Sequence, residues 1–182
     1  IGGYNGIWGV GYVDIIADNN TFQDINREPV IIGEYHFGDQ GWTVSGPQPA
    51  RAWFADNTFS NVSGTCESEK VWDAEFTCPV FHLFRSSVSI HRNTVYNAQG
   101  DVIRAIGAII DVQDNTFTAA GVGARIVQHD VPSGPQYGSL AFFSRNTWNN
   151  VSQVYNISES SVTVQSELIP NPTSSTTYPM EL

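Results

Sequence analysis

Two arginines, Arg104 and Arg125, are the residues whose type and spacing most readily suggest binding chemistry. Each stands ten or eleven residues after an Asn-Thr pair that recurs along the chain; Asn156 follows another copy at the same distance, and His82 is a candidate fourth member. Guanidinium groups bind carboxylates through two parallel hydrogen bonds, so a column of them could hold an acidic sugar. The alternative is that these arginines pair with carboxylates of the chain itself.

A second candidate surface involves Trp53 and Phe142, which both stand four residues before the recurring Asn. The same position holds Ile16, Ser89 and Asp111 in the other copies. Outward aromatic rings stack on sugar rings or are buried against another subunit. A third alternative is that an insertion covers them.

The histidines do not have the spacing of zinc ligands, so we expect no metal and no cofactor. They are His36, His82, His91 and His129. No Ser/His/Asp arrangement is evident from the sequence.

The elements that must position these residues come from a motif that occurs five times. Its corner residues are Asn20, Asn57, Asn93, Asn115 and Asn146. The residues five and three before, and two and five after, each Asn are apolar in every copy. The residues two after are Phe22, Phe59, Val95, Phe117 and Trp148, and those five after are Ile25, Val62, Ala98, Ala120 and Val151.

Apolar residues at every second position predict a strand with one buried face. The Asn is expected to turn the chain, because Asn tolerates the left-handed region. The copies are separated by 37, 36, 22 and 31 residues, which is typical of a solenoid whose rungs stack about 4.8 Å apart and share one core. We predict an all-β domain over residues 1–169 with about 5–6 rungs and an Asn ladder, followed by a Ser/Thr/Pro-rich tail over 170–182.

This pattern resembles the right-handed parallel β-helix of the pectate-lyase-like superfamily, whose repeats carry an inward Asn at a corner and then a buried aromatic residue. The resemblance covers roughly residues 10–168. It implies a right-handed parallel β-helix but little about activity, because that fold carries lyases, hydrolases, epimerases, phage spikes and non-catalytic surface proteins.

Enzymes of the superfamily place charged residues outward on one sheet, and their familiar motifs are missing here. The chain has no Asp-Asp, no Gly-His-Gly and no Arg-x-Lys. Val71-Trp72-Asp73 faintly matches a lyase motif but lacks the following His.

The charge distribution limits the partners. The chain carries a net charge of −10, with Lys70 as its single lysine, so no basic stripe could meet the phosphates of nucleic acid or of an anionic membrane. No apolar run approaches the ~20 residues that span a bilayer.

Cys66 and Cys78 flank a polar insertion, and a disulfide between them would place the chain in an oxidising compartment. Four glycosylation sequons agree with an extracellular location. They begin at Asn19, Asn61, Asn150 and Asn156.

The residues directly before each corner Asn predict an outward ladder of alternating charge. They are Asn19, Asp56, Arg92, Asp114 and Arg145. Facing opposite charges would specify the register of the rungs.

We therefore expect a non-catalytic extracellular module with a structural or adhesive role in a glycosylated surface assembly such as a filament, hair or wall layer. The alternatives are a polysaccharide lyase or hydrolase acting on acidic sugar, and a carbohydrate-binding module. Because the end strands of a β-helix offer unpaired backbone groups, self-association or contact with neighbouring chains through the helix ends is also expected.

Overall fold

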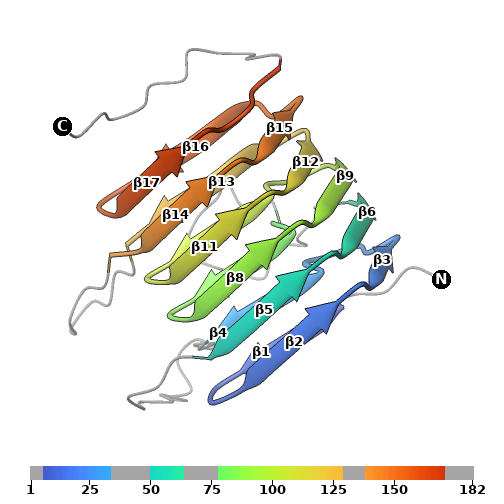
Figure 1. Ribbon diagram of the computed structural model, residues 1–182. Coiled ribbons are helices and arrows are strands. Elements are labelled where there is room, and N and C mark those ends of the chain that lie inside the picture. Colours follow the sequence, from blue (N-terminus) through green and yellow to red (C-terminus); the bar gives the residue numbers. More distant parts are fainter. Residues whose placement is uncertain (1–5, 34–49, 64–77, 129–137, 171–182) are drawn as a thin grey trace.

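A computed structural model describes residues 6–33, 50–63, 78–128 and 138–170, and within these ranges the chain contains strands and no helix. The strands form three sheets in which every neighbouring pair is parallel. The chain visits the three sheets in turn and then begins the next rung (Figure 1). This is the right-handed parallel β-helix that the repeat and the resemblance predict.

Each sheet collects one strand from each rung, except that the last described rung adds no strand to the third sheet. The first sheet contains β1 (Ile7–Val10), β4 (Val30–Gly33), β7 (Phe81–Phe84), β10 (Ile103–Ile106), β13 (Val122–Val127) and β16 (Gln153–Ile157). The second contains β2 (Asp14–Asp18), β5 (Arg51–Ala55), β8 (Ser87–His91), β11 (Ile109–Gln113), β14 (Leu140–Ser144) and β17 (Ser161–Gln165). The third contains β3 (Thr21–Gln23), β6 (Thr58–Val62), β9 (Thr94–Ala98), β12 (Thr116–Ala119) and β15 (Thr147–Asn149).

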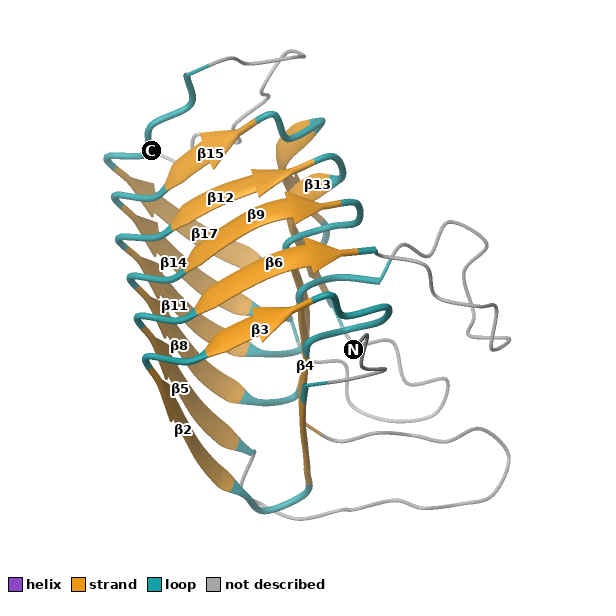
Figure 2. Cartoon of the chain, turned by 90° about the vertical axis from the view of Figure 1, so that its right-hand side faces the viewer, coloured by secondary structure: helices purple, strands orange, loops and turns teal. Residues whose placement is uncertain are grey.

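The core lies between the three sheets, whose rungs Figure 2 shows from the side, stacked one above the other. Residues at equal positions of successive rungs stack in columns: Phe22 lies on Phe59 with ring centroids 4.8 Å apart, and Phe117 lies on Trp148 at 4.6 Å. Phe59, Phe117 and Trp148 are fully buried in one core, as predicted. Each such side chain contributes roughly 1.5–3 kcal/mol by leaving water.

The corner between the second and third sheets differs from the prediction in one respect. The residue with left-handed backbone is the one before the Asn, with φ values of 54–58° at Asn19, Asp56, Arg92, Asp114 and Arg145. The Asn that follows keeps a negative φ and points its side chain inward. The prediction that the corner Asn itself turns the chain was therefore wrong, and its amide is used for hydrogen bonding between rungs instead.

A second left-handed corner follows four residues after the Asn, at Asp24, Asn61, Asn97 and Asn150. The fourth repeat has Ala119 at this place, and alanine disfavours the left-handed region. The register shifts there, so that Ala119 pairs with Ala98 and is buried while Ala120 is exposed. The predicted inward position of Ala120 was wrong for this reason.

The first described rung is less buried than the prediction requires. Ile15 and Phe22 are half-buried and Asn20 is exposed. Within the described residues a rung packs against them from one side only, whereas the equivalent residues of the inner rungs have neighbours on both sides.

A sixth corner, which the sequence analysis missed, closes the described part of the solenoid. Ser166 has a φ of 55° and precedes Glu167, which takes the place of the Asn. The apolar pattern continues around it, because Val162, Val164 and Ile169 occupy the inward positions and pack against the core. The signal was missed because a carboxylate replaces the amide that defined the motif.

Candidate functional site

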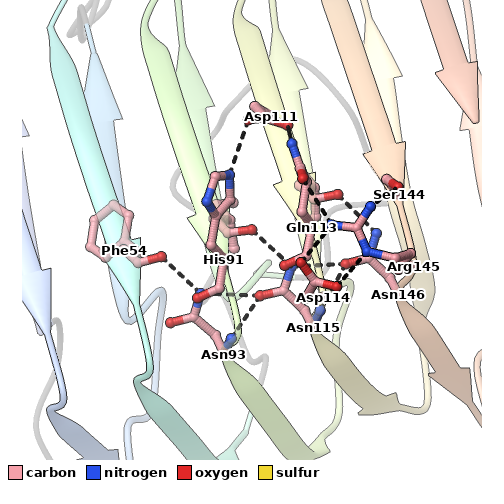
Figure 3. Close-up of polar contacts among 12 residues, drawn as sticks. Phe54, His91, Asn93, Asp111, Gln113, Asp114, Asn115, Ser144, Arg145 and Asn146 are labelled. Carbon is pink, nitrogen blue, oxygen red and sulfur yellow. Dashed lines mark hydrogen bonds and ion pairs between the residues drawn. The ribbon is translucent and has the colours of Figure 1, made fainter. Parts of the chain in front are cut away.

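The corner asparagines form a buried hydrogen-bonded ladder (Figure 3). In each step the backbone N–H and the side-chain Nδ2 of one Asn donate to Oδ1 of the Asn in the next rung. From Asn115 to Asn146 these distances are 3.0 and 2.8 Å, and from Asn93 to Asn115 they are 2.8 and 3.1 Å. The ladder continues through Asn57 to Asn20, so the predicted corner ladder is confirmed.

Glu167 accepts the last donors of this ladder. Its Oε1 accepts from the backbone N–H of Asn146 at 3.1 Å and from Asn146 Nδ2 at 3.0 Å. Its Oε2 accepts from the indole N–H of Trp148 and from the hydroxyl of Tyr155 at 2.9 Å. A carboxylate suits this position because four donors converge there and it offers acceptors only.

The predicted charge ladder is confirmed on the outside of the same corner. Asp56 accepts two hydrogen bonds from Arg92, and Asp114 accepts two from Arg145, with distances of 2.7–2.9 Å. These hydrogen bonds lower the pKa of Asp56 and of Asp114 below the ordinary range of an aspartate. Both pairs are exposed to water, so they help to select the register of the rungs but add little to the stability of the fold.

The first-sheet column consists of His82, Arg104, Arg125 and Asn156, which the strand register places side by side as the sequence predicted. It is not an open row of positive charge. Arg125 donates to Asp101 at 2.5 Å, and that carboxylate is buried and also accepts from the backbone N–H of Val122. The alternative in which an arginine pairs with a carboxylate of the chain therefore holds for Arg125.

At the other end of the column, His82 is 3% exposed and its Nδ1 lies 3.2 Å from Glu28 Oε1. Because a carboxylate can only accept, Nδ1 carries the proton of this hydrogen bond. Burial lowers the pKa of His82, the positive charge of Arg104 acts in the same direction, and both outweigh the effect of Glu28. The imidazole is therefore neutral at pH 7.

Trp53 and Phe142 lie on a different sheet from this column, so the structure separates the residues proposed for sugar binding into two groups. On the second sheet the register gives the outward column Ile16, Trp53, Ser89, Asp111, Phe142 and Thr163. Trp53 is exposed and Phe142 is half-buried. This face of the molecule points towards the viewer in Figure 1.

A shallow groove of about 280 Å³ crosses this face from β8 to β17. Its lining includes the exposed side chains of Ile109 and Leu140 from one column and the half-buried side chains of Asp111 and Phe142 from the next. Trp53 lies one rung beyond the end of the groove, next to Ser89.

A polar network on this face was not recognised in the sequence. Nε2 of His91 lies 3.0 Å from Asp111 Oδ2, and Gln113 Nε2 donates to Asp111 Oδ1 at 2.7 Å. Arg145 in turn donates to Gln113 Oε1 at 3.2 Å, which fixes the orientation of that amide (Figure 3). The ring of Trp53 meets His91 edge-on at 4.9 Å. The members come from rungs whose separation in sequence varies, so only the strand register brings them together.

The remaining predicted positions are surface features or lie outside the described residues. Asn19, Asn61 and Asn150 are exposed at left-handed corners, and Asn156 is half-buried in β16. Their glycosylation stays a prediction.

Cys78 is buried and disulfide-bonded, whereas Cys66 lies outside the described residues, so its identity as the partner stays a prediction. The described residues also leave out His36, His129, Lys70, Val71–Asp73 and the tail beyond Pro170.

Among the described residues no group of three or more His, Cys, Asp or Glu side chains could hold a metal ion. None of the described segments is a helix long and apolar enough to cross a membrane.

Comparison of the chain with protein-family models, curated proteins and solved structures finds no match.

Proposed function

We propose that this chain is a non-catalytic, extracellular β-helix module of the pectate-lyase-like superfamily, with a structural or adhesive role in a glycosylated surface assembly. The pairing of carboxylates with arginine and histidine side chains of neighbouring rungs carries the proposal. The pairs within the described residues are Asp14–Arg51, Glu28–His82, Asp56–Arg92, Asp101–Arg125, Asp111–His91 and Asp114–Arg145.

These pairs link successive rungs, which suits a load-bearing scaffold better than an acid–base site. A general acid or base must exchange a proton with substrate at the working pH. Arg125 is held by a buried carboxylate, and His82 is buried against Glu28. Among the described residues that line the groove on the second sheet, Asp111 is the single carboxylate, whereas glycoside hydrolysis ordinarily uses two.

The test is a turnover assay with polygalacturonate and with alginate, each with and without calcium. We expect no reducing ends and no absorbance from unsaturated product. A rise in absorbance that disappears in Arg104→Ala or Arg125→Ala, with the fold retained by circular dichroism, would overturn the non-catalytic assignment and favour a lyase acting on acidic sugar.

The extracellular assignment has its own test in the sequons. Secretion from a eukaryotic host should give a chain whose mass falls on treatment with an N-glycosidase. Replacement of Asn19, Asn61 and Asn150 by Gln should abolish most of that difference, because these three side chains are exposed at turns. Unmodified secreted chain would contradict the glycosylated assembly.

A further inference from the structure

The groove on the second sheet combines an apolar wall with hydrogen-bonding side chains. Ile109 and Leu140 are each 54% exposed and stand next to each other on neighbouring rungs, and Phe142 lies beside them. Ser87, Ser89, Asp111 and Thr163 supply hydroxyl and carboxylate groups along the same groove. A few polar groups set in an apolar hollow are typical of binding sites for small or chain-like ligands.

Asp111 is the strongest hydrogen-bonding group in the groove, and its position is fixed by two neighbours. One oxygen is held by His91 at 3.0 Å and the other by Gln113 at 2.7 Å. Each carboxylate oxygen can accept a second hydrogen bond, and the side chain is 39% exposed. The groove therefore offers a positioned pair of acceptors to a ligand that carries donors.

The same carboxylate disfavours two classes of partner. A dry protein interface would bury a carboxylate with part of its hydrogen-bonding capacity unused, which is costly. An acidic sugar would bring a like charge against Asp111, and no Lys or Arg is among the described residues that line the groove. A neutral sugar has neither problem, because its hydroxyls donate to the carboxylate and its C–H faces pack on apolar side chains.

We propose that the groove binds a neutral polysaccharide strand lying across the β-strands, parallel to the axis of the helix. Sugar rings pack on Phe142, Ile109 and Leu140, and hydroxyl groups donate to Asp111. Trp53 extends the site, since it lies in the same column as Phe142 but three rungs away, a distance of about 14 Å at the ordinary strand spacing. The inference rests on the proposed adhesive role and names its ligand.

The experiment is affinity electrophoresis of the whole chain in gels that contain hydroxyethylcellulose, galactomannan, xyloglucan or polygalacturonate, followed by titration calorimetry with the polysaccharide that retards it. The variants are Phe142→Ala, Asp111→Asn and Trp53→Ala. Tyr96→Ala is the matched control, because Tyr96 is an exposed aromatic residue on the third sheet.

We expect retardation by at least one neutral polysaccharide and none by polygalacturonate. Asp111→Asn and Phe142→Ala should each weaken binding about tenfold or more, as expected for loss of a charged hydrogen bond or an aromatic contact. Tyr96→Ala should bind like the parent chain. Circular dichroism must show that each variant is folded.

Three results would overturn the proposal: no retardation by any neutral polysaccharide, binding to polygalacturonate that equals or exceeds neutral binding, or equal losses in Tyr96→Ala and Phe142→Ala. A fall in native mass in Phe142→Ala would show that the face holds a second copy of the chain and would overturn it too. The turnover assay separates these failures from failure of the non-catalytic assignment, since it does not depend on the groove.

Discussion

Replacement of Asn115 by Ala tests whether the ladder stabilises the solenoid. Asn115 is 1% exposed and lies in the middle of the ladder. Its Oδ1 accepts from the backbone N–H of Asn93 at 2.8 Å, and its Nδ2 donates to the carbonyl oxygens of Ile90 and Gln113 at 2.8 and 2.9 Å. The substitution removes all of these bonds at a place that is closed to water.

The cost can be worked out from the groups left behind. Asn93 Nδ2 still donates to the carbonyl oxygens of Phe54 and His91, and Asn146 Oδ1 still accepts from the backbone N–H of residue 115. The buried N–H of Asn93 loses its acceptor, and one such orphaned donor costs roughly 1–3 kcal/mol. We expect Asn115→Ala to lower the free energy of unfolding by that amount.

Asn20→Ala is the matched control. Asn20 makes the same donations to Asn57 but is exposed, and its backbone N–H still donates to Asn57 Oδ1 after the substitution. Its expected cost is below about 0.5 kcal/mol, as for most surface changes. Asn115→Asp should cost more than Asn115→Ala at pH 7, because a carboxylate oxygen would then face the carbonyl oxygens of Ile90 and Gln113.

Urea unfolding followed by far-ultraviolet circular dichroism measures all three variants. Equal losses in Asn115→Ala and Asn20→Ala would refute the argument from burial. A loss below about 0.5 kcal/mol in Asn115→Ala would show that relaxation or water replaces the missing acceptor, and the ladder would then not be a source of stability.

Three further predictions concern the cap, the charge ladder and pH. Glu167→Gln should lower the free energy of unfolding by roughly 1–3 kcal/mol in urea unfolding, because an amide N–H₂ would face the donors of Trp148 and Tyr155. Unchanged stability would contradict the role of Glu167 as the acceptor at the end of the ladder. Asp114→Lys should lower the melting temperature less than Asn115→Ala does, and the difference from the parent should shrink as salt rises; salt-independent loss would exclude a charge effect. Burial lowers the pKa of His82 below its unfolded value of ~6.5, so the stability that the neutral imidazole contributes is complete above pH ~6.5 and is lost as the pH falls towards the folded pKa. This loss changes the free energy of unfolding by up to about 1.4 kcal/mol per pH unit. Between pH 7.5 and pH 5 the free energy of unfolding should therefore depend less on pH in His82→Gln than in the parent chain, and an equal dependence would assign the effect to another group.

The columns of the solenoid could be predicted from the sequence because they depend on spacing alone. Apolar residues three before and two after each corner Asn must share a face in any strand pairing that buries them, and Phe59, Phe117 and Trp148 do so. The charge alternation before the Asn likewise required only that equal positions stack, and Asp56–Arg92 and Asp114–Arg145 follow.

The sequence did not reveal which residue turns the chain, because Asn, Asp and Arg all occupy the left-handed position and residue type alone does not single it out. It also did not reveal the shift at Ala119 or the role of Glu167. Both depend on what the neighbouring rung offers: a partner at Ala98 in one case, and donors from Asn146, Trp148 and Tyr155 in the other.

The sequence by itself thus determined the fold, the inward columns and the paired charges at the corner, since a repeated pattern encodes repeated contacts. Only the tertiary structure decided which outward side chains meet. Arg125 and Asp101 are 24 residues apart, and His82 and Glu28 are 54 apart. The spacing of such partners varies with the length of each rung, so no sequence period indicates them. The pairing of Arg125 with Asp101 in the first-sheet column and the groove beside Asp111 arise from the register in which the finished rungs stack.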